Sequence, residues 1–216
     1  MSQEAWKILY DVIESYSYDE YMESRRLAIA ESFISNNTTF ETEVLLSDES
    51  CKSIIEWTSK HINDKILDTV DGLPEWQVTV VQKIMEKLCT VAEIRNIVQI
   101  AYDKYPSISN ADFYIRKYGD GARENLPWHA DQTVVSFTIH LSNYFEYEGG
   151  DFVFIEGKEI KRSSELKKGC GVFHSGDVIH SIEPVTKGNR WSLVSFFFAE
   201  DGQGNEWCTD ENKVIF

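Results

Sequence analysis

The chain has 216 residues, 42% of them hydrophobic and 26% charged. This profile excludes a disordered chain and favours one globular domain with appendages over two large domains. No run of about 18 apolar residues occurs and the N-terminus is acidic, so we expect a cytoplasmic protein with no membrane partner. The 36 acidic and 21 basic residues give a net charge of −15, which opposes binding to nucleic acid.

The first half of the chain is expected to be mainly helical. A polar cluster at 35–39 ends the first helical region, and Val44 to Leu46 is typical of a short strand or a hydrophobic staple. Ser47 is a suitable N-cap for a helix in which apolar residues recur at helical spacing. A turn is expected at 71–74. The predicted helices cover residues 4–34, 48–62 and 76–105, the last with a break at 89–90.

The second half is expected to be β structure. Residues 133–141 alternate strictly, with Val135, Phe137 and Ile139 on one face of the predicted strand. Gly149 and Gly150 indicate a tight turn, and the lysine-rich segment 156–169 is typical of a solvated loop. Helices followed by short strands favour an antiparallel sandwich or barrel buttressed by helices. Further strands are expected at 112–118, 151–155, 170–173, 177–182 and 190–198.

Three residues of the β half have the side chains of a metal site. His129 and Asp131 are two residues apart, so extended backbone points both to the same side. His180 follows beyond several predicted strands. Two imidazoles and one carboxylate suit non-haem Fe(II), because they leave three positions for a bidentate co-substrate and O₂. Arg190, at the start of the next predicted strand, offers a guanidinium fork for the far end of a dicarboxylate co-substrate.

These residues belong to a series of motifs that runs from about residue 44 to residue 199. In chain order the motifs are Leu45-Leu46-Ser47-Asp48-Glu49-Ser50-Cys51, Tyr118-Gly119, His129-x-Asp131, Gly149-Gly150-Asp151-Phe152, Phe173-His174-x-Gly176 leading to His180, and Pro184-Val185-x-x-Gly188-x-Arg190. The series resembles the 2-oxoglutarate- and Fe(II)-dependent dioxygenases, and within them the prolyl 4-hydroxylase and lysyl hydroxylase group. In having arginine at position 190, the chain is more similar to the lysyl hydroxylase and oxygen-sensing branches of this group than to the collagen-type enzymes, many of which have lysine there.

The resemblance implies cofactors and a role for each matching residue. The cofactors are Fe(II), 2-oxoglutarate and O₂, with ascorbate in support. Arg190 would bind the distal carboxylate of 2-oxoglutarate, and Tyr118 matches a tyrosine whose hydroxyl assists it. His140 falls where relatives have a tyrosine or asparagine that lines the same pocket. The iron ligands implied are His129, Asp131 and His180.

The implied fold is mainly β with N-terminal helices (α+β), a double-stranded β-helix or jelly roll buttressed by helices. We expect an acidic helical extension at 1–43 and a single dioxygenase domain at 44–216. Within this domain, the prediction is helical support at 44–106, a jelly-roll core at 107–199 and an acidic tail at 200–216. Since the motifs begin near residue 44, removal of the first 38 residues should spare the binding sites, unless these helices support the β core.

The expected activity is hydroxylation of a C–H bond coupled to conversion of 2-oxoglutarate to succinate and CO₂. A prolyl or lysyl residue in a polypeptide is the first substrate class, and a free amino acid or other small molecule is the second. Phe196 stands where DNA-dealkylating relatives have a second arginine, which also disfavours nucleic acid. The alternative from another class is an inactive jelly-roll scaffold that binds metal. His61 and His174 are expected to be structural, and the oligomeric state is open.

Overall fold

The computed structural model describes residues 2–16, 20–36, 39–62, 66–68, 70–80, 82–131, 133–163, 166–199 and 214–215. The helices are α1 (Gln3–Ser15), α2 (Glu20–Ile34), α3 (Asp48–His61), α4 (Gln82–Leu88) and α5 (Val91–Lys104). The strands are β1 (Thr39–Glu41), β2 (Ile66–Leu67), β3 (Pro74–Thr79), β4 (Ile108–Gly119), β5 (Leu126–His129), β6 (Val135–His140), β7 (Tyr147–Gly149), β8 (Phe152–Glu156), β9 (Glu159–Ser163), β10 (Gly171–Ser175), β11 (His180–Ile182), β12 (Val185–Ala199) and β13 (Val214–Ile215). Apart from β13, the predicted acidic tail lies outside the described residues.

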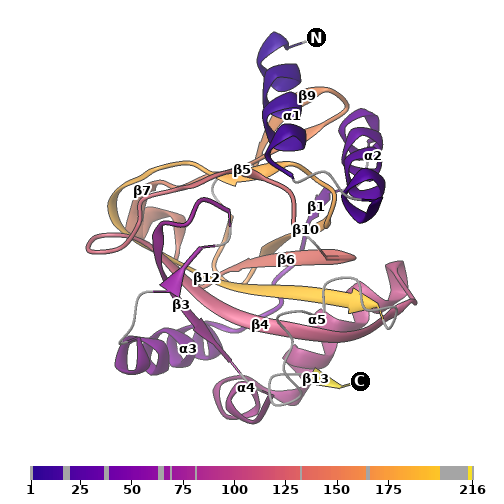
Figure 1. The fold of residues 1–216 in the computed structure, drawn as a ribbon. Coiled ribbons are helices and arrows are strands. Elements are labelled where there is room, and N and C mark those ends of the chain that lie inside the picture. The colour runs from indigo at the N-terminus through magenta and orange to yellow at the C-terminus, as the bar shows by residue number, and fades with distance from the viewer. Residues whose placement is uncertain are drawn as a thin grey trace.

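Two antiparallel sheets face each other, and each has helices on its outer side (Figure 1). The larger sheet has the order β1-β10-β6-β12-β4-β3-β2, and the smaller has the order β5-β11-β8-β9. Helices α3 to α5 pack on the larger sheet through a core that includes Ile54, Ile97 and Phe137. A second core, with Tyr118 and Phe152, lies between the sheets. This is the predicted jelly roll with helical support, and the mainly β fold class is confirmed.

Strand β6 shows how the alternating pattern prepares the site. Val135, Phe137 and Ile139 are fully buried and pack toward α3 to α5, as the period of two predicts. The intervening polar residues Ser136 and His140 are also buried. Their face of the strand is the inner face of the jelly roll, so polar groups lie inside the molecule where a ligand can use them.

Three local predictions were wrong. Of the two alternatives at Val44 to Leu46, the strand is not formed, because the backbone N–H groups of Leu45 and Leu46 both donate to the carbonyl of Gly169 (2.8 and 3.3 Å). The start of the predicted helix 76–105 is instead β3, which pairs with β4 from Trp76 to Thr79. The lysine-rich loop contains β9, which pairs with β8. For β3 a strand partner distant in sequence decides the conformation, which a short run of residues does not specify. Strand β9 instead forms a hairpin with β8, the strand directly before it.

The predicted N-terminal helices and caps are present. Ser47 caps α3, with its Oγ accepting the N–H of Ser50 at 3.2 Å. Helix α4 ends before the predicted break and α5 follows it. Gly149 and Gly150 have φ of 76° and 72° and form the expected turn. A Cβ on Gly150 would lie 3.0 Å from Cδ of Arg190, so this glycine also makes room for the arginine.

Helices α1 and α2 cover the outer face of the smaller sheet (Figure 1). Their buried apolar side chains form one cluster with Ala130, Ile155 and Ile179 of that sheet and its loops. The side chains from the two helices are Ala5, Ile8, Leu9, Val12, Ile29 and Phe33. This packing favours the alternative in which the extension supports the β core, although the proposed division at residue 43 stays a prediction.

Deletion of residues 1–36 is therefore expected to leave the chain unfolded or insoluble. Burial of one such apolar side chain contributes about 1.5–3 kcal/mol, and a domain is stable by only about 5–15 kcal/mol. Thermal unfolding followed by circular dichroism would measure the effect, with Tyr10→Ser as control, since Tyr10 lies on α1 and is 65% exposed. A truncated chain that melts like the full chain would show that the helices are dispensable.

Candidate functional site

The fold brings together the three predicted metal ligands. Strands β5 and β11 are antiparallel neighbours, with His129 opposite His180, and Asp131 follows directly after β5. One ligand atom from each of the three residues lies within 4.8 Å of the others. All three residues are buried. The pairing of two strands 50 residues apart thus completes a set of which the sequence shows only two members side by side.

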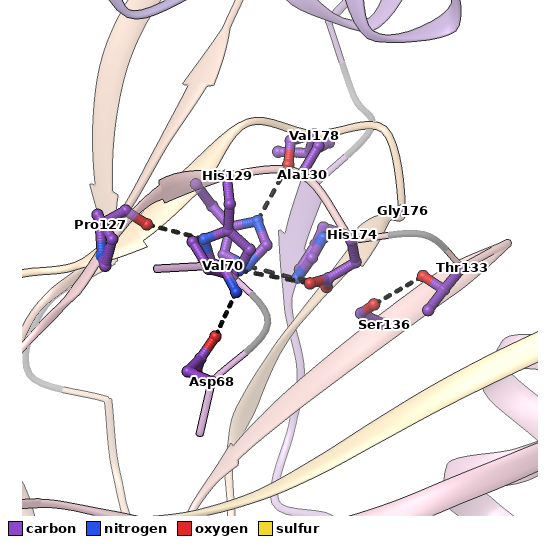
Figure 2. A network of polar contacts seen from close by, with 12 residues as sticks. Asp68, Val70, Pro127, His129, Ala130, Thr133, Ser136, His174, Gly176 and Val178 are labelled. Carbon is purple, nitrogen blue, oxygen red and sulfur yellow. Dashed lines mark hydrogen bonds and ion pairs between the residues drawn. The ribbon is translucent and has the colours of Figure 1, made fainter. Parts of the chain in front are cut away.

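Backbone carbonyls fix the orientation of both imidazoles (Figure 2). A carbonyl only accepts hydrogen bonds, so Nδ1 of His129 donates to Pro127 O (2.8 Å) and Nδ1 of His180 donates to Val178 O (3.0 Å). Each neutral ring therefore has the lone pair on Nε2, which lies 3.5 Å (His129) or 3.8 Å (His180) from the Asp131 carboxylate. The hydrogen bond from Nδ1 to a backbone carbonyl is the usual support of a histidine that binds a metal through its other nitrogen.

The ionisation of the cluster also suits a cation. Burial lowers the pKa of His180 well below its usual value, which keeps this imidazole neutral. Two imidazole nitrogen donors and one carboxylate are a ligand set for a divalent transition metal, and open positions remain around it.

Arg190 shares a cavity with the predicted metal ligands His129, Asp131 and His180, which are here together called the metal cluster. This cavity is lined by His129, Asp131 and His180 and also by Arg190 and Tyr118, which are paired residues on β12 and β4. Arg190 is 0% exposed. Its Nη1 donates to Ser192 Oγ (2.7 Å), Nε has no hydrogen-bond partner, and no carboxylate of the described residues forms an ion pair with it. Burial of a guanidinium without a counter-ion is unfavourable in free energy, so this cavity is suited to bind an anion.

Tyr118 and His140 surround this guanidinium. The Tyr118 ring centroid lies 5.6 Å from Cζ of Arg190, and Nη2 of Arg190 donates to Nε2 of His140 at 3.3 Å. Nδ1 of His140 then carries the proton and faces the hydroxyl of Tyr147 at 3.3 Å. Burial, and then the charge of Arg190, lower the pKa of His140 well below its usual value, so the ring stays a neutral acceptor.

Three residues near the metal cluster were missed or given another role in the sequence analysis. Tyr16 donates to the carbonyl of Ala130 (3.0 Å), and Arg25 of α2 donates to the carbonyl of Asp131 (2.5 Å). No local pattern reveals these contacts, because more than 100 residues separate the partners. His174, expected to be only structural, has its Nε2 3.8 Å from Asp131 Oδ2. Its place in the motif before His180 was the one available signal.

A buried charge cluster adjoins the cavity at Arg116. Arg116 lines the cavity, and its Nη1 and Nη2 lie 3.7 Å from Asp68 Oδ2 and 3.6 Å from Glu75 Oε2. The two carboxyl groups are buried and hydrogen-bonded to each other. Burial raises the pKa of Glu75 to about 8, whereas the bond to Glu75 and the charge of Arg116 lower that of Asp68. Glu75 therefore carries the shared proton at neutral pH.

This proton predicts a pH-dependent stability. The folded state keeps the Glu75 proton up to about pH 8, whereas the unfolded state loses it near pH 4.5. The free energy of unfolding should thus fall between these pH values, by up to about 1.4 kcal/mol per pH unit from this group. Glu75→Gln should remove that part of the slope in urea unfolding at pH 6 and 8. Glu56→Gln, at an exposed site, is the control. An unchanged slope in Glu75→Gln would contradict the shared proton.

Comparison with known proteins shows which curated proteins this chain resembles in sequence. No family model matches the chain. It is 42% identical over 69 residues to a PKHD-type hydroxylase of Saccharophagus degradans, covering 32% of this chain and 29% of the relative. It is 30% identical over 107 residues to one of Picosynechococcus, covering 46% and 45%. The chain thus spans less than half the length of these curated relatives.

Solved structures agree over most of the chain. A prolyl-4-hydroxylase of Pseudomonas putida superimposes with a TM-score of 0.61 at 14% identity, covering 80% of this chain and 99% of the other. The chain has the fold of the 2-oxoglutarate- and Fe(II)-dependent oxygenases. A viral collagen prolyl hydroxylase from Paramecium bursaria Chlorella virus-1, solved with 2-oxoglutarate, gives 0.56 at 16% identity over 76% and 96%. The resemblance to the prolyl 4-hydroxylase-like oxygenases predicted from the motifs is confirmed. No described helix is long and apolar enough to span a membrane.

Proposed function

We propose that this chain is an Fe(II)- and 2-oxoglutarate-dependent hydroxylase. The observation that carries the proposal is the buried Arg190, which has no anionic partner among the described residues and shares a cavity with the His129, Asp131 and His180 cluster. A metal would bind to the ligand set at one end of this cavity, and a dicarboxylate that reaches Arg190 would neutralise the guanidinium at the other. The relatives named PKHD-type hydroxylases support the same activity.

Each residue has a definable task in this reaction. When bound, Fe(II) with 2-oxoglutarate and O₂ supplies the oxidising chemistry that hydroxylates a C–H bond and releases succinate and CO₂. His129, Asp131 and His180 hold the metal in a cavity with little access to water. Arg190 neutralises the distal carboxylate of 2-oxoglutarate, and Tyr118 adds a hydroxyl beside it. Neutral His140 orients the guanidinium through Nη2.

A prolyl or lysyl residue of a polypeptide is the substrate class we propose. The support is the similarity in fold to the prolyl-4-hydroxylase and the viral collagen prolyl hydroxylase. A small-molecule substrate is the second candidate, because an epimerase from nogalamycin biosynthesis has the same fold, with a TM-score of 0.58 at 11% identity. Both candidates are compatible with the same metal and co-substrate sites.

The test is a product search by mass spectrometry. Peptide and metabolite fractions of a cell lysate are incubated with the protein, Fe(II), 2-oxoglutarate and ascorbate, and products heavier by one oxygen atom are sought. The Asp131→Ala variant, which lacks the carboxylate ligand, is the matched control. A hydroxylated peptide that forms only with the wild type supports the first class, and a hydroxylated metabolite supports the second. Absence of both products together with no succinate would contradict the proposed activity.

A further inference from the structure

The chain segment that carries Asp131 is held by side chains from the two N-terminal helices. The hydroxyl of Tyr16, the residue that ends α1, donates to the carbonyl of Ala130 at 3.0 Å. Nη2 of Arg25 on α2 donates to the next carbonyl, that of Asp131, at 2.5 Å. Two successive carbonyls, one of them belonging to a metal ligand, are thus bound from helices on the outer face of the smaller sheet.

Arg25 also reaches the segment that leads to His180. Its Nη2 donates to the carbonyl of Gly176 at 3.4 Å, and its Nη1 forms an ion pair with Asp177 Oδ1 at 2.6 Å. Gly176 and Asp177 lie between β10 and β11, and β11 begins with His180. One planar guanidinium therefore joins the segment of the carboxylate ligand to the segment before a histidine ligand.

These contacts are shielded from water and supported within the helices. The side chains of Arg25 and Asp177 are 12% and 24% exposed, so solvent screens their ion pair only in part. Nη2 of Arg26 donates to the carbonyl of Tyr16 (2.8 Å), which ties the end of α1 to α2. Ala130 itself belongs to the buried apolar cluster of the two helices. Polar and apolar contacts together therefore fix this segment against α1 and α2.

Strand pairing does not fix the backbone at Asp131. Strand β5 ends at His129, so the two residues that follow it lie beyond the pairing with β11. The direction of the Asp131 side chain depends on this backbone, and its carboxylate has to face Nε2 of both histidines to share a metal with them. The hydrogen bonds from Tyr16 and Arg25 supply the restraint that strand pairing supplies elsewhere.

We infer that Arg25 and Tyr16 are positioning residues of the metal site, which hold the backbone of Asp131 so that its carboxylate faces the two histidines. The inference rests on the metal site of the proposed function. Neither residue lines the cavity, so each acts through the backbone rather than on the metal itself. Partners that orient a ligand in this way contribute about 10–100-fold to metal affinity. The N-terminal helices then take part in metal binding besides supporting the β core.

Cobalt binding tests this role, because the visible absorption of Co(II) reports the geometry of its ligands. Arg25→Lys keeps the charge but loses the planar fork, and it should lower the affinity for Co(II) by at least about tenfold and alter the absorption spectrum. Tyr16→Phe removes only the hydroxyl and should lower the affinity by about threefold.

Phe33→Leu is the matched control on α2. Phe33 is buried in the apolar cluster of the two helices but donates no hydrogen bond to the Asp131 segment. Its replacement should lower the melting temperature and leave the Co(II) affinity and spectrum unchanged, with binding measured well below the transition.

The outcomes separate this inference from the proposed function. Wild-type affinity and spectrum in both Arg25→Lys and Tyr16→Phe would overturn the positioning role and leave the three-residue metal site intact. An equal loss of affinity in Phe33→Leu would also overturn it, since the effect would then follow from general loosening of α2. No Co(II) binding by the wild type would overturn both. If Arg25→Lys fails to fold, Tyr16→Phe decides the question by itself.

Discussion

Replacement of His129 or His180 by alanine is expected to lower the affinity for Fe(II), or for Mn(II) as a redox-silent substitute, by at least about 100-fold. Each change removes a neutral nitrogen donor whose lone pair faces Asp131. Loss of a residue that only supports a ligand already costs about 10–100-fold, so loss of a ligand should cost more. Titration calorimetry of the metal-free protein measures the effect.

The control for these variants is His61→Ala. His61 lies at the end of α3, is exposed and stacks on Trp57, away from the cavity. Its replacement should leave metal binding unchanged. Wild-type affinity in both His129→Ala and His180→Ala would place the metal elsewhere in the protein.

Arg190→Leu is expected to weaken 2-oxoglutarate binding by about 2–5 kcal/mol, the usual loss when one partner of a buried charge pair is removed. Metal affinity should change little, because Arg190 contacts Ser192 and His140 rather than the metal cluster. Arg190→Lys should be milder but not neutral, since an ammonium group does not reproduce the planar fork. Tyr118→Phe should cost about 1 kcal/mol if its hydroxyl reaches the carboxylate.

The measurement is titration of the charge-transfer absorbance of the Fe(II) and 2-oxoglutarate complex without oxygen. Ser195→Ala is a matched control on β12, because Ser195 is buried on the same strand but does not line the cavity. Wild-type 2-oxoglutarate affinity in Arg190→Leu would show that the arginine has a structural role and that the co-substrate binds elsewhere.

The features that the sequence predicted well depend on short-range geometry. Extended backbone places His129 and Asp131 on one side, and alternation along 135–139 assigns one face of β6 to the core. Ser47 begins α3 because its side chain reaches the N–H of Ser50, three residues away. The motifs around His180 and Arg190 added the rest of the candidate site through the family resemblance.

By itself, then, the sequence, read with the family resemblance, predicted the jelly-roll class, the three expected metal ligands and Arg190 as the expected partner of a carboxylate. Only the tertiary structure decided which other groups meet them. His174 reaches Asp131 because β10 lies in the larger sheet opposite the end of β5, and Arg25 reaches the same loop from α2. Residues 74–79 became a strand because β4 pairs with them. Such contacts join residues far apart in the chain, so no local pattern specifies them.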